Sequence, residues 1–296
     1  MTHFPASGIA TAQIPASMEA SPKHVLDGKL QAGMMPLGTR LYITDVGIDP
    51  VADIIKASRM VTDMGYSPAP HIPARRIESE GALEARLSGL VNDGGVNDVL
   101  IIAGEADRQM GPYGETLEVL QTGLIDKLGI GHVAVGGHPE GNVAYGGRDV
   151  MGVLKDKLAY ETQSDAQFRI ATQFGFDGAK FVAWAKAVRE AGIENPIHLG
   201  VAGPAKITTL IKYAAMCGVG NSLNFFKKRT GAIAQLATKH SPEDVVQPIE
   251  NAWRAGDTLI EQLHVFPFGG LQNACTWLTE RGSFVFEQDI AVAVGR

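Results

Sequence analysis

Cysteine is scarce in this chain of 296 residues, and the scarcity excludes a disulfide-stapled fold. Cys217 and Cys275 are the only cysteines, and they do not form a CxxC pair. We therefore expect a reduced, cytoplasmic protein. No apolar run approaches the roughly 20 residues of a membrane-spanning helix. Residues 1–16 lack the basic start and apolar core of a signal peptide, so we expect no membrane association.

Basic residues are fewer than acidic ones: the chain has 26 Lys and Arg residues and 32 Asp and Glu residues, and its formal net charge is −6. This balance argues against a nucleic-acid or anionic-membrane surface. Neither the glycine fingerprint of a dinucleotide-binding unit nor a Walker loop occurs in the sequence. An open, doubly wound dinucleotide-binding sheet is therefore disfavoured.

The chain instead contains short strand patterns that alternate with helix patterns. The expected strands are Ala16–Ala20, Arg40–Thr44, Ala69–Pro73, Asp98–Ala103, His132–Gly136, Phe168–Gln173, Ile197–Val201 and Gln262–Phe266. The expected helices are Pro50–Met64, Ser79–Asn92, Thr116–Gly129, Arg148–Glu161, Gly178–Ala191, Lys206–Met216, Asn221–Lys239 and a last one from Ser241 to Ala255. Eight strands with intervening helices predict an α/β fold, a single-domain (β/α)8 TIM barrel over residues 16–296. Residues 1–15 are expected to form a flexible tail.

Helix ends are marked by particular residues. Asp49 is predicted to cap a helix that has Pro50 at its first position. Gly218 is predicted to follow the end of another helix, where a left-handed glycine is common. Pro248 is predicted to kink the last helix.

Side chains that do chemistry in a barrel lie at the carboxyl ends of its strands. Thr172 and Gln173 end an apolar strand just before a helix. Gln173 is neutral and is both a donor and an acceptor, so it suits recognition of a heterocyclic amide edge. The alternative is that Gln173 only caps the strand end or the next helix.

Other polar residues occupy corresponding strand ends: Glu19, Thr44, His71, Glu105, His138, Glu140 and His264. A desolvated Glu19 has a raised pKa and can serve as a general acid near neutrality. The alternative is an exposed glutamate in a frayed segment. His138 and Glu140 could ligate a metal together with His71, or His138 could contact a cofactor, or the loop could simply enter a helix. We favour no metal.

Several charged residues leave two interpretations open. Glu105 and Asp107 could bind a basic heterocycle or lie in a solvated loop. Arg75 and Arg76 could meet a phosphate or form a solvated helix entry. Lys157 lies in a helix pattern, and we expect it at the surface.

These motifs resemble the flavin-dependent methylenetetrahydrofolate reductases, in the right order from about Glu19 to Phe268. The more specific matches are His138-Pro139-Glu140 and Ala171-Thr172-Gln173-Phe174-Gly175-Phe176-Asp177. Weaker matches are Ser17-Met18-Glu19-Ala20-Ser21-Pro22, Ile43-Thr44, Ala69-Pro70-His71-Ile72 and Ala103-Gly104-Glu105.

The resemblance implies a cytoplasmic oxidoreductase of one-carbon metabolism and methionine biosynthesis. It implies that FAD reduces 5,10-methylenetetrahydrofolate to 5-methyltetrahydrofolate, with NADH, NADPH or another electron donor. It implies that Glu19 is the general acid, with Glu105 also catalytic, and that Gln173, Glu105 and Phe225 hold the folate. The implied FAD contacts are Thr44, His71, Gly104, Glu105, His138, Gly141, Asp149 and Lys157. We also expect a homo-oligomer.

The chain departs from the family in ways that bear on substrate and donor. Glu105 stands where the family usually has aspartate, and Phe266-Pro267-Phe268-Gly269 replaces a Tyr-Thr-Leu-Asn stretch. Two other hypotheses therefore stay open. One is a folate-binding barrel that acts in one-carbon transfer or demethylation without redox chemistry. The other is a metal-dependent or non-enzymatic barrel.

Overall fold

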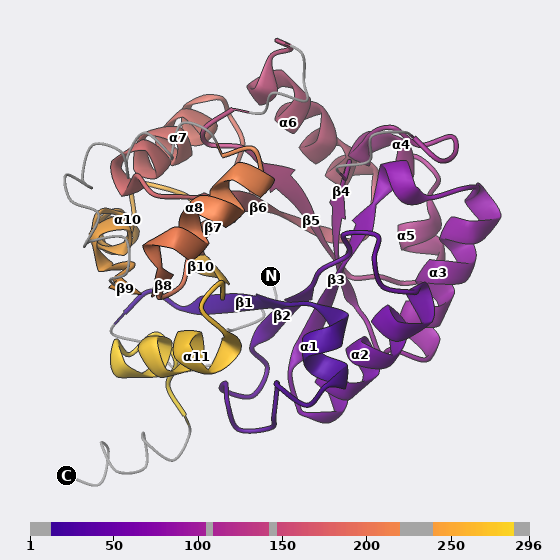
Figure 1. Cartoon of the computed structure of the whole chain (residues 1–296). Helices are drawn as coiled ribbons and strands as arrows, with labels where there is room; N and C mark the ends of the chain where they lie inside the picture. Colours follow the sequence, from indigo (N-terminus) through magenta and orange to yellow (C-terminus); the bar gives the residue numbers. More distant parts are fainter. Residues whose placement is uncertain (1–12, 105–108, 142–146, 220–238, 287–296) are drawn as a thin grey trace, which may run out of the picture. The chain divides into compact units, whose positions relative to one another are not determined.

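The computed structural model describes residues 13–104, 109–141, 147–219 and 239–286. Eight parallel strands form a closed barrel in the order β1-β10-β7-β6-β5-β4-β3-β2, with helices between them (Figure 1). The barrel strands are β1 (Ala16–Ala20), β2 (Arg40–Ile43), β3 (Ser67–Pro73), β4 (Asp98–Ile102), β5 (His132–Gly137), β6 (Gln167–Gly175), β7 (Ile197–Ala202) and β10 (Ile260–Phe266). The predicted (β/α)8 fold is confirmed.

The helices are α1 (Pro22–Leu26), α2 (Val51–Asp63), α3 (Glu80–Asn92), α4 (Thr116–Leu120), α5 (Leu124–Lys127), α6 (Val150–Ala159), α7 (Gly178–Glu190), α8 (Ile207–Met216), α10 (Glu243–Ala255) and α11 (Leu271–Glu280). Short 3₁₀ turns occur at η1 (Ala74–Arg76) and η3 (Tyr160–Gln163), and β8 (Ala205–Lys206) pairs with β9 (Lys239–His240) outside the barrel. The expected helix Asn221–Lys239 lies almost wholly outside the described residues.

Two helix predictions were wrong in detail. The cap of α2 is Pro50, and no side chain caps this helix, so Asp49 does not have the predicted role. The expected helix Thr116–Gly129 is divided into α4 and α5, because Gly123 takes a left-handed conformation with φ of 70°. Gly218 follows α8 with φ of 67°, as predicted, and Pro248 lies inside α10.

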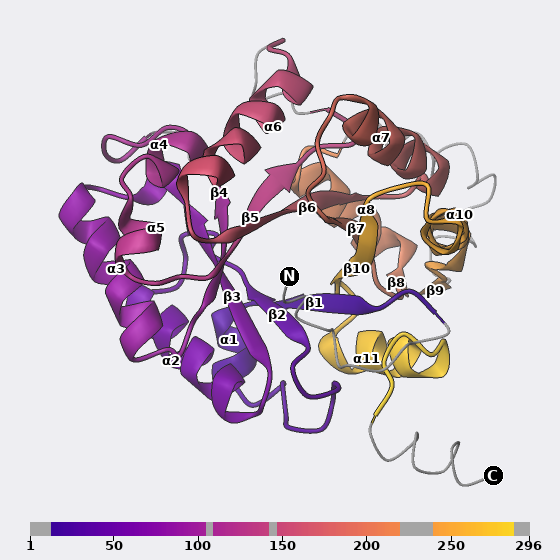
Figure 2. The ribbon, with the colours of Figure 1, turned by 180° about the vertical axis from the view of Figure 1, so that it is seen from behind.

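The chain divides into two compact units, which are described separately. Unit 2 comprises Glu19–Gly136 and Leu154–Ile170, and unit 1 comprises the remaining segments. In unit 2, β2 through β5 pair in parallel. Helix α2 packs against β3 and α3, and α3 packs against α5, as both ribbon views show (Figures 1 and 2).

A buried charged cluster fills the amino-terminal side of the strands in unit 2. Asp98 accepts hydrogen bonds from Arg40 and Arg169, both at 2.7 Å, and Arg169 also donates to the Tyr42 hydroxyl at 3.0 Å. Burial by itself would raise the pKa of Asp98, but the two guanidinium charges outweigh burial and lower it. Burial raises the pKa of Tyr42. This end of a barrel is where stability rather than chemistry is usually built.

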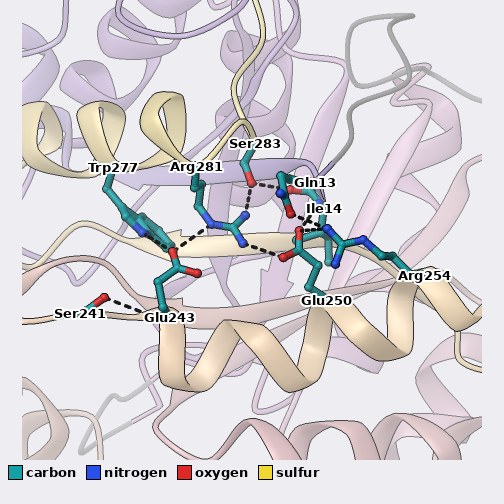
Figure 3. A network of polar contacts seen from close by, with 9 residues as sticks. All are labelled: Gln13, Ile14, Ser241, Glu243, Glu250, Arg254, Trp277, Arg281 and Ser283. Atoms are coloured by element: carbon teal, nitrogen blue, oxygen red, sulfur yellow. Dashed lines mark hydrogen bonds and ion pairs between the residues drawn. The ribbon is translucent and has the colours of Figure 1, made fainter.

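In unit 1, the start of β1 pairs with β10, and β10 pairs with β7. Helix α10 packs against α7 and β10. Figure 3 shows the polar network that joins α10 and α11 to the chain before β1. The buried Glu250 accepts from the Ile14 N–H at 2.8 Å and from Arg281 at 3.1 Å, and Arg281 also donates to Glu243 at 3.1 Å.

None of the helices within the described parts of the chain is long and apolar enough to cross a membrane.

Candidate functional site

Unit 2 brings together predicted site residues from two strand ends. Glu19 is the fourth residue of β1, and His71 is the fifth residue of β3. The Oε2 atom of Glu19 lies 3.9 Å from Nε2 of His71, and the two side chains are 15% and 11% exposed. Glu19 is therefore held in a strand beside an imidazole, and the alternative of an exposed glutamate in a frayed segment was wrong.

The neighbouring strand ends are held by backbone contacts. The N–H of Thr44, directly after β2, donates to the Ala20 carbonyl at 3.0 Å. Gly104, shortly after β4, has φ of 82°, and a Cβ there would lie 2.8 Å from Cβ of Pro73. Only glycine lets this loop approach β3 so closely. Glu105 and Asp107 lie outside the described residues.

The Arg75 side chain forms hydrogen bonds with the loop after β4. Its guanidinium donates to the Gly114 carbonyl at 3.0 Å and to the Gly104 carbonyl at 3.3 Å. The Met110 N–H in turn donates to the Arg75 carbonyl at 2.8 Å. This geometry supports a structural role for Arg75 rather than phosphate binding.

In unit 1, the carboxyl end of β6 shows how Thr172 and Gln173 are used. The buried Thr172 hydroxyl donates to the Gln173 carbonyl at 3.0 Å and accepts from the Gly200 N–H of β7 at 2.8 Å. The half-buried Gln173 side chain accepts through Oε1 from the Phe174 N–H at 3.0 Å. A backbone donor thus faces the amide oxygen, and the NH₂ group is the part that Gln173 can offer to a ligand. The bond from the Phe174 N–H is the strand-end contact of the alternative interpretation, and recognition of a ligand by Gln173 stays a prediction.

The loop after β5 carries the next predicted residues of unit 1. The Gly141 N–H donates to the His138 carbonyl at 3.0 Å and closes a turn. Glu140 lies against Gly175 of β6, where a Cβ would be 3.3 Å from the Glu140 Oε1 atom. Asp149, further along, is exposed and accepts from the Met151 N–H at 3.0 Å, at the start of α6. Among the residues that the structure describes, no group of three or more His, Cys, Asp or Glu side chains is placed to hold a metal ion.

Lys157 was expected at the surface, and this prediction was wrong. The residue is only 5% exposed, and its Nζ donates to the Gly136 carbonyl of β5 at 2.7 Å. Burial lowers the pKa of Lys157 to about 8. Lys157 lies on the same face of α6 as the buried Leu154 and Leu158, and the sequence interpretation placed it outside only because a lysine is rarely buried.

An aromatic group at the ends of β6 and β10 was not predicted as part of a site. Phe268 stacks on Tyr213 of α8, with ring centroids 4.2 Å apart and an angle of 15°. Phe174 packs edge-on against Phe268 at 4.8 Å, and Phe266 lies 5.1 Å from Phe174. Phe266 and Phe268 are only partly buried, so aromatic surface remains accessible. The Phe-Pro-Phe stretch in the sequence was the available indication. Phe225, implied as a folate contact, lies outside the described residues.

Two further residues of unit 2 were missed altogether. Arg86 of α3 donates to the His71 carbonyl at 2.8 Å and to Asp45 at 2.7 Å. Both side chains are nearly fully buried. No local pattern in the sequence marks either residue, because the contact joins a helix to two strand ends.

No family model matches the chain. Among solved structures, an uncharacterized protein from Clostridium thermocellum, which binds two copies of 5-methyl-5,6,7,8-tetrahydrofolic acid, superposes with a TM-score of 0.55. The two sequences are 10% identical, over 92% of this chain and 96% of that protein. This likeness shows a shared barrel fold.

Two other solved structures are more distant. Dihydropteroate synthase from Thermus thermophilus is 13% identical, with a TM-score of 0.47 over 92% of this chain and 95% of that one. An endo-β-1,3-glucanase from Sorangium cellulosum is 10% identical, with a TM-score of 0.46 over 88% of this chain and 91% of that one. Superpositions of this quality carry no argument about function.

Proposed function

We propose that the chain binds a reduced folate of the 5-methyltetrahydrofolate class and acts in one-carbon transfer or demethylation without a redox step. The observation that carries the proposal is the Glu19–His71 pair at the carboxyl ends of β1 and β3. The folate bound by the C. thermocellum barrel supports the choice of ligand class.

The chemistry of folate one-carbon units explains why an acid–base pair suits this ligand. In a balanced transfer, a nucleophilic co-substrate forms a bond to the methyl carbon as the N5–CH3 bond breaks, N5 keeps the electron pair and a proton, and tetrahydrofolate is released; the methyl group leaves readily only when N5 gains that proton. A carboxyl group beside an imidazole can hold a proton and deliver it, and partial burial limits exchange with bulk water. Glu19 and His71 have this arrangement, with 3.9 Å between Oε2 and Nε2.

Unit 1 offers groups that suit a flat, amide-bearing ring. The Gln173 NH₂ group is a donor held in place by the bond from the Phe174 N–H to its oxygen. The partly buried Phe266 and Phe268 rings, tilted by 34° with 5.8 Å between their centroids, provide apolar aromatic surface. A pterin presents both ring acceptors and an aromatic face.

Flavin-dependent reduction of methylenetetrahydrofolate is the second candidate, because the order of its family motifs matches the order of the strand ends here. Two of the implied FAD contacts fit poorly, however. The Lys157 amine is buried against the Gly136 carbonyl, and Asp149 accepts from the backbone at the start of α6. We therefore rank the non-redox function first.

One pair of measurements separates these functions. The purified chain is titrated with (6S)-5-methyltetrahydrofolate by calorimetry, and its absorbance spectrum is recorded before and after incubation with FAD. Folate binding by a colourless protein is the expected result. Flavin bands that bleach anaerobically with NADH would establish the reductase instead, and flavin bands without bleaching would indicate a different electron donor. A protein that takes up neither ligand would contradict both functions.

A further inference from the structure

The ladder between β2 and β3 ends just before His71. Its last pair is Ile43 with Pro70, and beyond it the side chain of Arg86 takes the position of a hydrogen-bond donor to β3. Nη2 of Arg86 donates to the His71 carbonyl at 2.8 Å. Strand β3 contains three prolines, at positions 68, 70 and 73, which donate no hydrogen bonds. On its other side, this end of β3 pairs with β4, His71 opposite Leu100 and Ile72 opposite Ile101, so Arg86 adds a side-chain donor to the His71 carbonyl where the pairing with β2 has ended.

The same guanidinium also holds the loop after β2. Nη2 of Arg86 lies 2.7 Å from Oδ2 of Asp45, and the two side chains are 7% and 5% exposed. The other oxygen of Asp45 accepts from the Gly47 N–H at 2.8 Å, which closes a turn. Arg86 thus links α3, the loop after β2 and the end of β3 through one buried group.

His71 is the residue on which these contacts act. Its backbone carbonyl is held by Arg86, while its ring lies 3.9 Å from Glu19 and edge-on to the Tyr42 ring, with 6.3 Å between ring centroids. A strand end that shifts by a fraction of an ångström moves the attached side chain with it. A change at Arg86 can therefore reach the distance between His71 and Glu19 through the backbone of β3.

We propose that Arg86 is a positioning residue that sets the place of the His71 imidazole relative to Glu19 by holding the His71 carbonyl. The expected effect of Arg86 on folate binding rests on the proposed function. The effect of Arg86 on the position of the His71 ring does not require a bound ligand. Small displacements of such groups are known to weaken function strongly, even when the altered residue is remote from the chemistry.

The test compares Arg86→Met and Arg86→Lys with the parent chain. The ring signals of His71, assigned with a His71→Asn variant, are recorded by NMR in the ligand-free protein. Affinity for (6S)-5-methyltetrahydrofolate is measured by calorimetry. Arg86→Met should shift the His71 signals and weaken folate binding roughly tenfold or more. Arg86→Lys keeps a charged donor and should restore part of both.

Two more variants keep the test decisive. Arg59→Met removes an exposed arginine of α2 that forms an ion pair with Asp63 on the same helix, and it should change neither readout. Asp45→Asn keeps an oxygen for the Gly47 N–H and leaves the bond from Arg86 to His71, so it should shift the His71 signals less than Arg86→Met does. If Arg86→Met does not fold, Arg86→Lys and Asp45→Asn provide the comparison.

The outcomes separate the two proposals. A folded Arg86→Met protein with unchanged His71 signals overturns the positioning role, as does an Asp45→Asn effect as large as that of Arg86→Met. A parent chain that does not bind the folate overturns the proposed function, while the NMR comparison still decides the positioning role.

Discussion

The side-chain oxygen of Gln173 is used within the fold, and we expect its NH₂ group to be the part that meets a ligand. Its oxygen accepts from the Phe174 N–H at 3.0 Å, so only the NH₂ group can donate to a ligand. Gln173→Glu keeps an acceptor for Phe174 and removes the donor. We expect the affinity for 5-methyltetrahydrofolate to fall about tenfold, as for loss of one ligand hydrogen bond, with little change in stability.

Calorimetric titration of Gln173→Glu measures this effect. Gln272→Glu, which makes the same change on the exposed side of α11, is the control and should bind as the parent does. Equal affinity in the two variants would show that Gln173 only caps the strand end.

Lys157 makes the stability of the protein depend on pH in a predictable direction. Its pKa in the folded state is about 8, below the ordinary value of 10.5, because of burial. Between these values the unfolded chain binds more protons than the folded one, so stability increases as the pH rises. Relative to a Lys157→Met variant, the free energy of unfolding of the parent should rise by about 3 kcal/mol across this window.

Urea denaturation at several pH values between 7.5 and 10.5 measures the difference. Lys155→Met, at an exposed position of the same helix, provides the control. A difference between parent and Lys157→Met that stays constant with pH would mean that Lys157 titrates normally.

At the level of elements, the approach of β6 to β7 depends on Gly200. A Cβ on Gly200 would lie 2.6 Å from both the Thr172 and Gln173 carbonyl oxygens. These are backbone atoms, so they cannot move aside as a flexible side chain can. Gly200→Ala should therefore destabilise the protein by about 2 kcal/mol or more, in the range of overpacked sites.

The midpoint of urea unfolding measures the loss. Gly81→Ala in the first turn of α3 is the matched control, because only Ser79 Oγ lies nearby, at 4.0 Å, and alanine favours a helix. We expect Gly81→Ala to be neutral or slightly stabilising. A Gly200→Ala protein as stable as the parent would show that the two strands can separate without cost.

At the level of the whole chain, a buried network joins positions that are far apart in sequence. Glu250 binds the Ile14 N–H, 236 residues away, and pairs with Arg281, and the two side chains are 5% and 7% exposed. Arg281→Met leaves the Glu250 carboxylate buried without this partner. Breaking a buried pair costs about 3–5 kcal/mol when the remaining charge is left alone, and we expect the lower end of this range because Arg254 stays 3.5 Å from Glu250.

Denaturant unfolding of Arg281→Met tests this expectation. Lys186→Met breaks the ion pair with Asp257, in which both side chains are 47% exposed, and should change the stability little, because water screens an exposed pair. Similar losses in the two variants would mean that the buried network adds no more than a surface pair does.

The sequence was sufficient to predict the barrel and the positions of its strands. The expected Ala16–Ala20 strand has the observed bounds, and the other seven differ by a few residues at their ends. Strand alternation and helix periodicity come from the local chain, so they can be recognised without knowing what packs against them. The same local information placed Thr172, Gln173 and His138 at strand ends.

Tertiary structure decided how those residues are used. It paired Glu19 with His71, buried Lys157 against the Gly136 carbonyl, and directed Arg86 to the end of β3. Each of these contacts joins two different elements of the fold. Their energy depends on burial and on distances of a few ångströms between atoms, and neither quantity is encoded in a residue's immediate neighbours. The sequence by itself therefore determined which elements form and in what order, whereas the surroundings of each charged group were determined only when the elements packed together.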